Sequence, residues 1–112
     1  MALTVKTLND GQLGSTAQGT LYTVPTGKAT IVKNQRFVNR DTATRTMNLY
    51  YLRFGGANTS ARLLLPSNLS LAAGGLVIEQ DELTMAAGDL IQGDASVASK
   101  IDFVISGIER DA

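Results

Sequence analysis

A nine-residue pattern occurs twice in the second half of the chain, 14 residues apart, and it constrains the fold more than any other feature. Residues 69–77 are LSLAAGGLV and residues 83–91 are LTMAAGDLI. In each copy an apolar-polar-apolar triplet, typical of a short β-strand, precedes Ala-Ala-Gly and a second apolar pair. The glycine after each triplet indicates a turn. The repeat therefore predicts short strands separated by tight turns, and neither copy contains a chemically reactive side chain.

Apolar segments bounded by Gly, Pro, Asn or Ser continue this pattern along the chain. They predict further strands at residues 20–24, 28–39, 45–54, 61–65 and 101–108. Residues expected to point into the core are Met47, Leu49, Tyr51, Ile101, Phe103 and Ile105. In the segment 28–39, Ile31 and Val32 are adjacent apolar residues, which predicts a β-bulge or a strand that crosses between sheets. We expect an all-β domain, an antiparallel β-sandwich or jelly roll of about eight strands over residues 20–112.

Residues 1–19 differ in composition from this domain, because Gly, Ser, Thr, Gln and Asn predominate in them. They are expected to form an extended N-terminal arm. Leu3, Val5 and Leu8 open the arm with a spacing that suits a strand. Two alternatives follow from that spacing. The strand either adds to the sheet edge of a neighbouring subunit or closes the sheet of its own domain.

The composition excludes most enzyme classes. The chain has no His, Cys or Trp, so it lacks the commonest general base, the thiol nucleophile and nearly every transition-metal ligand. We expect no catalytic residues, no cofactor and no metal site. No apolar run approaches the ~20 residues that span a bilayer, and the first residues do not resemble a leader peptide. Synthesis in the cytoplasm as a soluble protein, without membrane contact, is the expectation.

The net charge is zero, but the charges are unevenly distributed along the chain. Residues 28–62 contain seven basic residues and one acid, for a net charge of +6, whereas residues 63–112 contain two basic residues and eight acids, for −6. One interpretation is that the β fold interleaves the two halves and pairs these charges within one subunit. The other is a bipolar surface that meets copies of itself head to tail.

Two side-chain groups suggest binding sites but have simpler explanations. The acidic group is Glu79, Asp81, Glu82, Asp89 and Asp94. Carboxylates suit Ca²⁺, yet the spacing matches no EF-hand loop, so a solvated acidic rim is preferred. The group of cations and aromatics is Arg36, Phe37, Arg40, Arg45, Tyr50, Tyr51, Arg53 and Phe54. Such mixtures bind single-stranded nucleic acid, but Phe37 and Tyr51 fall at core positions, so nucleic acid is not the expected partner.

A family resemblance covers residues 20–109. The segments that carry it are LYTVPTGKATIVK at 21–33, VN at 38–39, MNLY at 47–50, LPSNLSLAAG at 65–74 and VISG at 104–107. Together they resemble the small β-sandwich proteins among the virion structural proteins of tailed bacteriophages. These motifs are turns and core strands, so they relate more closely to the fold than to the role.

The resemblance implies a non-enzymatic virion component. The most plausible role is a capsid decoration, or cement, protein on the capsid surface, which clamps neighbouring major-capsid subunits, often as a homotrimer. A tail or baseplate component would contain the same kind of module, and a carbohydrate-binding or nucleic-acid-binding β module is the alternative from another class. The expected partners are copies of the chain and the major capsid protein or another virion protein. Residues expected at the interface are Leu3, Val5, Leu8, Arg36, Arg40 and Arg45.

Overall fold

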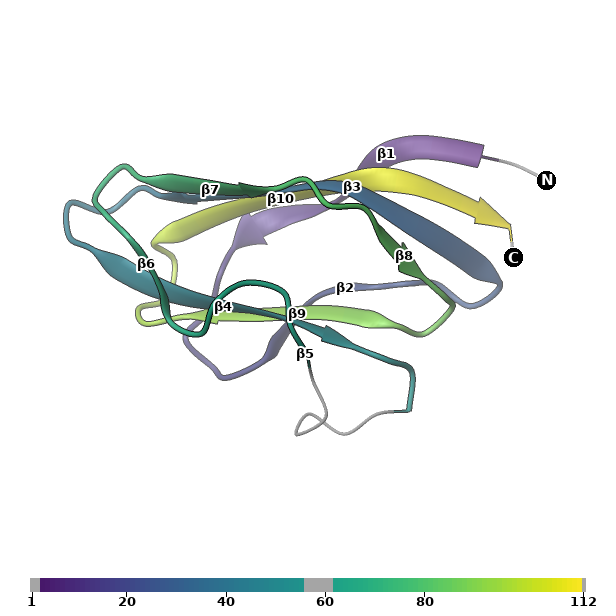
Figure 1. Cartoon of the computed structure of the whole chain (residues 1–112), viewed down its shortest axis with the longest axis horizontal. Coiled ribbons are helices and arrows are strands. Elements are labelled where there is room, and N and C mark those ends of the chain that lie inside the picture. The colour runs from purple at the N-terminus through teal and green to yellow at the C-terminus, as the bar shows by residue number, and fades with distance from the viewer. Residues whose placement is uncertain (1–2, 56–61, 112) are drawn as a thin grey trace.

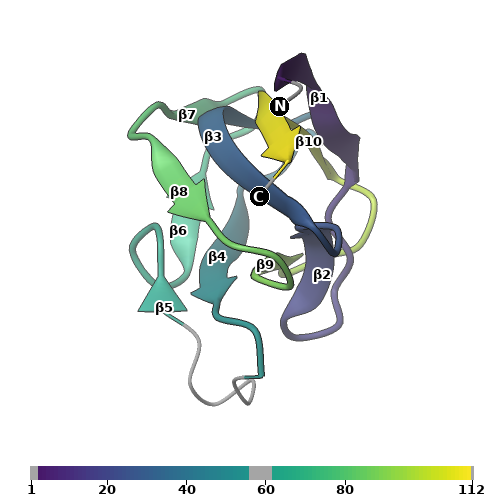
Figure 2. The same ribbon diagram turned by 90° about the vertical axis from the view of Figure 1, so that its right-hand side faces the viewer.

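Two antiparallel β-sheets pack face to face in the computed structural model, which describes residues 3–55 and 62–111. Figure 1 shows the two layers from the side, and Figure 2 shows them along the strands. Sheet A contains β1 (Leu3–Gln12), β3 (Lys28–Asn39), β7 (Leu76–Glu79), β8 (Leu83–Met85) and β10 (Ile101–Asp111). Sheet B contains β2 (Gly19–Thr23), β4 (Arg45–Leu52), β5 (Arg62–Leu63), β6 (Leu69–Leu71) and β9 (Leu90–Ala95). The predicted all-β sandwich is confirmed. No helix that could cross a bilayer occurs in the described ranges.

The strand order places two long strands at the centre of sheet A. Its order is β1-β10-β3-β7, and β8 pairs with β3 beyond the end of β7. Sheet B has the order β2-β9-β4-β5, and β6 also pairs with β4. Because β1 and β10 are antiparallel, both chain ends lie at the same end of the sandwich (Figure 1).

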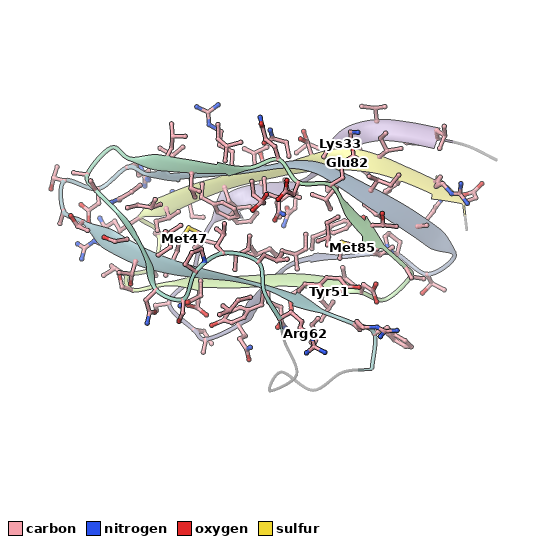
Figure 3. The ribbon with its side chains drawn as sticks, viewed as in Figure 1. Lys33, Met47, Tyr51, Arg62, Glu82 and Met85 are labelled. Atoms are coloured by element: carbon pink, nitrogen blue, oxygen red, sulfur yellow. The ribbon has the colours of Figure 1, made fainter. Side chains whose placement is uncertain are left out.

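The core fills the space between the sheets with the side chains that alternation assigns to it. Met47, Leu49, Ile101 and Ile105 have no exposed surface, and Phe103 is 5% exposed. Tyr51 is half-buried and packs against the same cluster. In Figure 3, the Met47 side chain on β4 points toward sheet A, and the Met85 side chain on β8 points toward sheet B. Burial of these apolar side chains supplies most of the favourable free energy of folding.

The two sequence repeats form matching arches between the sheets. The first runs from β6 in sheet B to β7 in sheet A, and the second runs from β8 in sheet A to β9 in sheet B (Figure 2). Gly74 has φ 72° and Gly88 has φ 86°, the left-handed conformation that the third position of a type II turn requires. The N–H of Gly74 donates to Asn39 O, and the N–H of Gly88 donates to Val24 O, each at 2.9 Å. The Ala-Ala-Gly turns therefore hold the ends of β3 and β2 against the arches.

The bulge predicted in residues 28–39 is present at Lys33. Asn34 pairs with Ser106, but the next pair is Val32 with Gly107, so Lys33 is the extra residue on β3. The extra residue shifts the alternation of inward and outward side chains along β3 by one position. Val32 and Gln35 both point inward, while Ile31 lies on the opposite face.

Residues 3–12 form an edge strand of the domain's own sheet. β1 pairs with β10 from Leu3 opposite Arg110 to Gln12 opposite Asp102, with a register shift around Leu8. Leu13, which follows the strand, is fully buried, and Leu8 packs against the core. Of the two alternatives for the N-terminal strand, the structure shows the one in which it closes the sheet of its own domain, and Leu8 and Leu13 of the expected arm contribute to the core. Pairing with β10 provides hydrogen bonds for the N–H and C=O groups of β1, so few apolar side chains are needed to hold this strand against the domain.

Candidate interaction surface

Sheet A carries large apolar side chains on both of its faces. Its inner face packs on the core, and its outer face, directed away from sheet B, lies at the top of Figure 1. Seven large apolar side chains are strongly exposed in the described part of the chain. Five of them lie on this outer face: Leu3 (67%), Val5 (82%), Leu76 (47%), Ile78 (42%) and Val104 (42%). Five of the seven strongly exposed apolar side chains thus share one sheet face, so the outer face of sheet A is the candidate interaction surface.

Strand register arranges the outer face in rows across the sheet. One row contains Ile78 of β7, Arg36 of β3, Val104 of β10 and Asp10 of β1, in that order. A second row, separated from the first by Asn34, Ser106 and Thr7, contains Thr84, Ile31, Ile108 and Val5. Side chains in a row stand ~4.8 Å apart, the spacing of neighbouring strands. The first row thus alternates apolar and charged side chains, and the second row is apolar except for Thr84.

Most other charges near this face are paired within the subunit. Lys33 at the bulge forms an ion pair with Glu82, and Figure 3 shows the two side chains together beside the upper sheet. Arg40 lies 3.4 Å from Asp102. In the described residues, Arg36 and Asp10 form no ion pair with each other or with any other side chain. Both side chains are exposed to solvent.

The six residues expected at an interface fall into two groups. Leu3, Val5 and Arg36 lie exposed on the outer face of sheet A. Leu8, Arg40 and Arg45 are engaged within the subunit: Leu8 packs on the core, Arg40 lies beside Asp102, and Arg45 Nη2 lies 2.5 Å from Asp41 Oδ2. The structure thus brings only the first three together on one surface.

The charge asymmetry of the sequence is largely resolved inside the subunit. Within the described residues, basic side chains of 28–62 form ion pairs with acidic side chains of 63–112 at Lys28–Asp111, Lys33–Glu82 and Arg40–Asp102. Antiparallel pairing of β3 with β10 and the course of the chain around β7 and β8 bring these partners together. The interleaving alternative therefore describes the fold.

The acidic residues considered for metal binding do not converge. Glu79, Asp81 and Glu82 surround the β7–β8 connection, whereas Asp89 and Asp94 are buried in sheet B. No group of three or more His, Cys, Asp or Glu side chains positioned to hold a metal ion occurs in residues 3–55 and 62–111. Asp94 accepts hydrogen bonds from the Gln18 backbone at 3.0 Å and from Asn48 at 2.9 Å. The two buried carboxylates thus serve as hydrogen-bond acceptors inside the fold.

A cleft of about 570 Å³ lies at the other end of sheet B from the repeat turn at Gly74. Thr23, Pro25, Arg53 and Phe54 are among its lining residues. Phe54 is 78% exposed, and its ring lies over Gly88, where a Cβ atom would approach Phe54 Cδ1 to 2.3 Å. A concave site with an exposed aromatic ring and a cation is a common feature of small-ligand sites.

Glu109 is the centre of a buried polar cluster between the sheets. Its carboxylate accepts hydrogen bonds from Tyr22 Oη at 2.6 Å and from Lys6 Nζ at 3.0 Å, and Tyr22 Oη lies 2.8 Å from Thr30 Oγ1. The Tyr22 hydrogen bond lowers the pKa of Glu109, burial opposes that effect, and Lys6 reinforces it. Burial, and then the bond to Glu109, raise the pKa of Tyr22. The cluster joins β1, β2, β3 and β10.

Replacing Glu109 with Gln should weaken the acid dependence of stability. A carboxyl whose folded-state pKa is lowered contributes stability above its unfolded pKa, and that stability is lost as the pH falls through the folded value. We expect Glu109→Gln to cost about 1–3 kcal/mol at pH 7, because hydrogen bonds to a charged acceptor are lost. Between pH 7 and pH 3, the free energy of unfolding measured with urea should fall less for the variant than for the parent protein.

Glu82→Gln is the matched control, because its pair with Lys33 is about half exposed and contributes less than about 1 kcal/mol. An acid dependence of Glu109→Gln that equals that of the parent protein would contradict the assignment of Glu109.

Sequence patterns pointed only weakly to the outer face of sheet A. The signal was the run of adjacent apolar residues at Ile31-Val32 and at Phe103-Val104-Ile105, which departs from the alternation of a one-sided strand. From the first run we predicted a bulge or a strand that crosses between sheets, and in the second we assigned Phe103 and Ile105 to the core and gave Val104 no role. The residues of the surface that were missed are Leu76, Ile78, Val104, Ile31 and Ile108.

Comparison with known proteins assigns the chain to no family. No protein-family model matches it, and no curated protein matches it. Among solved structures, that of the infectious bursal disease virus Gx strain is similar to 96% of this chain, with 14% sequence identity and a TM-score of 0.43. The chain spans 32% of the length of that viral chain.

Proposed function

We propose that the chain is a non-enzymatic structural protein of a bacteriophage virion, a capsid decoration protein that binds and stabilises the major-capsid lattice. The observation that carries the proposal is the uncovered apolar outer face of sheet A. Five strongly exposed apolar side chains on one sheet face raise the free energy of an isolated protein in water. Burial of these side chains in an assembly that covers the face stabilises that assembly. The sequence resemblance to small β-sandwich virion proteins supplies the phage setting.

Stabilisation of a shell follows from mass action. A protein that binds assembled neighbouring subunits, and not separated ones, adds its binding free energy to the cost of separating them. The symmetry of a capsid repeats this contact over the whole lattice, so modest affinity at each position accumulates. A rigid sandwich suits this role, because few degrees of freedom are lost when it binds.

The test is binding to empty shells of the encoding phage that were assembled without this chain. We expect co-sedimentation at a copy number proportional to the capsid lattice, and a higher melting temperature of the shells. Val104→Asp places a charge on the outer face of sheet A and should reduce shell binding about tenfold or more, since an unpaired buried charge is costly.

Leu63→Asp is the control, because Leu63 is 50% exposed on sheet B and Val104 is 42% exposed on sheet A. Absence of binding to shells, with binding to isolated tails, would favour a tail or baseplate component instead. Equal loss in both variants would overturn the assignment of the face.

The cleft that contains Phe54 and Arg53 favours a second candidate, a carbohydrate-binding or nucleic-acid-binding module. An exposed ring stacks on sugars or bases, and an arginine contacts phosphate or hydroxyl groups. Titration with oligosaccharides and with single-stranded DNA, using Phe54→Ser as the comparison, distinguishes this candidate. Binding that depends on Phe54 would support it.

A further inference from the structure

The outer face of sheet A is large enough to form a stable interface. β3 spans 12 residues, which at ~3.3 Å per residue gives a length of about 40 Å. Four strands at ~4.8 Å spacing give a width of about 19 Å, so the face covers roughly 760 Å². A standard protein interface buries about 800 Å² on each partner. One complete contact can therefore cover this face.

The order of side chains in the first row is complementary to itself. The row is Ile78, Arg36, Val104 and Asp10. A two-fold axis parallel to the strands, running above the sheet between β3 and β10, places the row of one copy over the same row of another in reverse order. Val104 then lies over the partner's Arg36, and Asp10 lies over the partner's Ile78. In projection onto the sheet, each Arg36 is displaced from the partner's Asp10 by one strand spacing, and the two side chains can meet across the ~10 Å between the sheets.

The second row agrees with this arrangement. Under the same axis, Ile31 of each copy lies over the partner's Ile108, and Val5 lies over the partner's Thr84, so apolar surface meets mostly apolar surface. Arg110 lies at the end of the face, opposite Ala29, where solvent screens it. Sheets that pack face to face with near-aligned strands stand ~10 Å apart, which these side chains fill.

A two-fold axis perpendicular to the strands fits less well. It would place the first row over the second row of the other copy, with Arg36 over the partner's Ile31 and Asp10 over the partner's Val5. Both charges would be buried without a partner, which costs far more than the apolar contacts gain. The perpendicular axis would also bring Asp102 near the partner's Arg110, but Asp102 is already paired with Arg40 within its own subunit. The parallel axis is the one that pairs Arg36 and Asp10, the two charges of the first row, which form no ion pair within the described part of the subunit.

We propose that the outer face of sheet A binds a second copy of the chain about a two-fold axis parallel to its strands, with reciprocal Arg36–Asp10 ion pairs across the interface. The inference rests on the proposed function for its setting in the virion. It assigns the outer face of sheet A to a second copy, so the dimer, and not the single chain, is the unit that binds the shell. It replaces the homotrimer implied by the sequence resemblance with a dimer, because each row is complementary to its own reverse. The dimer then presents both Phe54 clefts on its two outer sides.

The experiment is sedimentation velocity of the full chain from 1 to 100 μM. The parent protein should be a dimer. Arg36→Glu and Asp10→Arg should each raise the dissociation constant about tenfold or more, because each places like charges together. The double variant Arg36→Glu, Asp10→Arg restores opposite charges and should return the dissociation constant to within about threefold of the parent value.

Arg53→Glu provides the matched control, since it makes the same change of charge at the cleft on sheet B and should leave dimerisation unchanged. Circular dichroism of each variant establishes that it is folded. A monomer at 100 μM, a trimer, or a double variant as weak as the single variants overturns the proposal. A monomer that still binds shells would overturn the dimer alone, and the capsid protein would then cover the face; a dimer that binds no shells would overturn the proposed function alone.

Discussion

Replacing Asp89 with alanine should lower the free energy of unfolding by about 3 kcal/mol or more, because three donors lose one buried acceptor. Asp89 is 6% exposed. Its carboxylate accepts hydrogen bonds from Tyr51 Oη at 2.6 Å, from the Phe54 backbone at 2.9 Å and from the Ala86 backbone at 3.0 Å. One side chain therefore ties the second repeat turn to the end of β4, and it holds the backbone of Phe54 in place at the cleft.

Graded variants separate the contributions at Asp89. Tyr51→Phe removes one donor and should cost about 1 kcal/mol, and Asp89→Ala should lower the melting temperature by an amount on the order of 10–15 °C. Urea unfolding at pH 7 measures the change in the free energy of unfolding, and thermal unfolding at the same pH measures the change in melting temperature. If Asp89→Ala stays within about 0.5 kcal/mol of the parent protein, the variation typical of surface positions, the carboxylate is not the acceptor we describe.

The pH dependence of these variants has a defined sign. Burial raises the pKa of Asp89, but hydrogen bonds from Tyr51 and from the Phe54 and Ala86 backbones outweigh it and lower the pKa below its usual value. The stability that Asp89 contributes is thus complete above pH ~4 and is lost as the pH falls through the folded value. Burial, and then Asp89, raise the pKa of Tyr51 to about 12. The stability that the Tyr51 hydroxyl contributes is present below pH ~10 and is lost as the pH rises toward 12.

Gly107→Ala should destabilise the protein by about 3 kcal/mol or prevent folding, because a Cβ atom there has no space. The added atom would lie 2.2 Å from Ile31 O and 3.0 Å from Val32 Cα, which are backbone atoms and cannot rotate away. The bulge at Lys33 is the cause, since it brings the β3 backbone close to β10 at this position. To accept alanine, the two central strands of sheet A would have to separate.

Gly14→Ala is the control, because no atom lies within 4 Å of its Cβ position. It should change the free energy of unfolding by less than about 0.5 kcal/mol. Soluble yield and thermal unfolding of the two variants provide the measurement. A Gly107→Ala protein as stable as Gly14→Ala would mean that the bulge does not constrain β10.

The amino-acid sequence by itself determined the elements of the fold. Alternation of apolar residues predicted the strands and the inward positions Met47, Leu49 and Ile105, because that alternation directly records which face is buried. Pro25-Thr26-Gly27 and the Ala-Ala-Gly repeats predicted turns for an equally local reason, the backbone conformations that glycine and proline favour. The predicted interface included Leu3, Val5 and Arg36, which do share one surface.

The tertiary structure alone decided how these elements meet. Leu3 pairs with Arg110 across nearly the whole chain, and the choice between its own sheet and a neighbour's depends on which edge is available, which a local pattern does not contain. Ile31 and Val32 are equally apolar and face opposite sides of the sheet, and the bulge at Lys33 decided which of the two points into the core. Asp89 appeared as one acid among five, and its role arose because β4 brings Tyr51 and Phe54 to it from more than 30 residues away. The outer face of sheet A and the buried acceptor Asp89 thus arise from strand pairing between residues far apart in the sequence, which a local pattern does not contain.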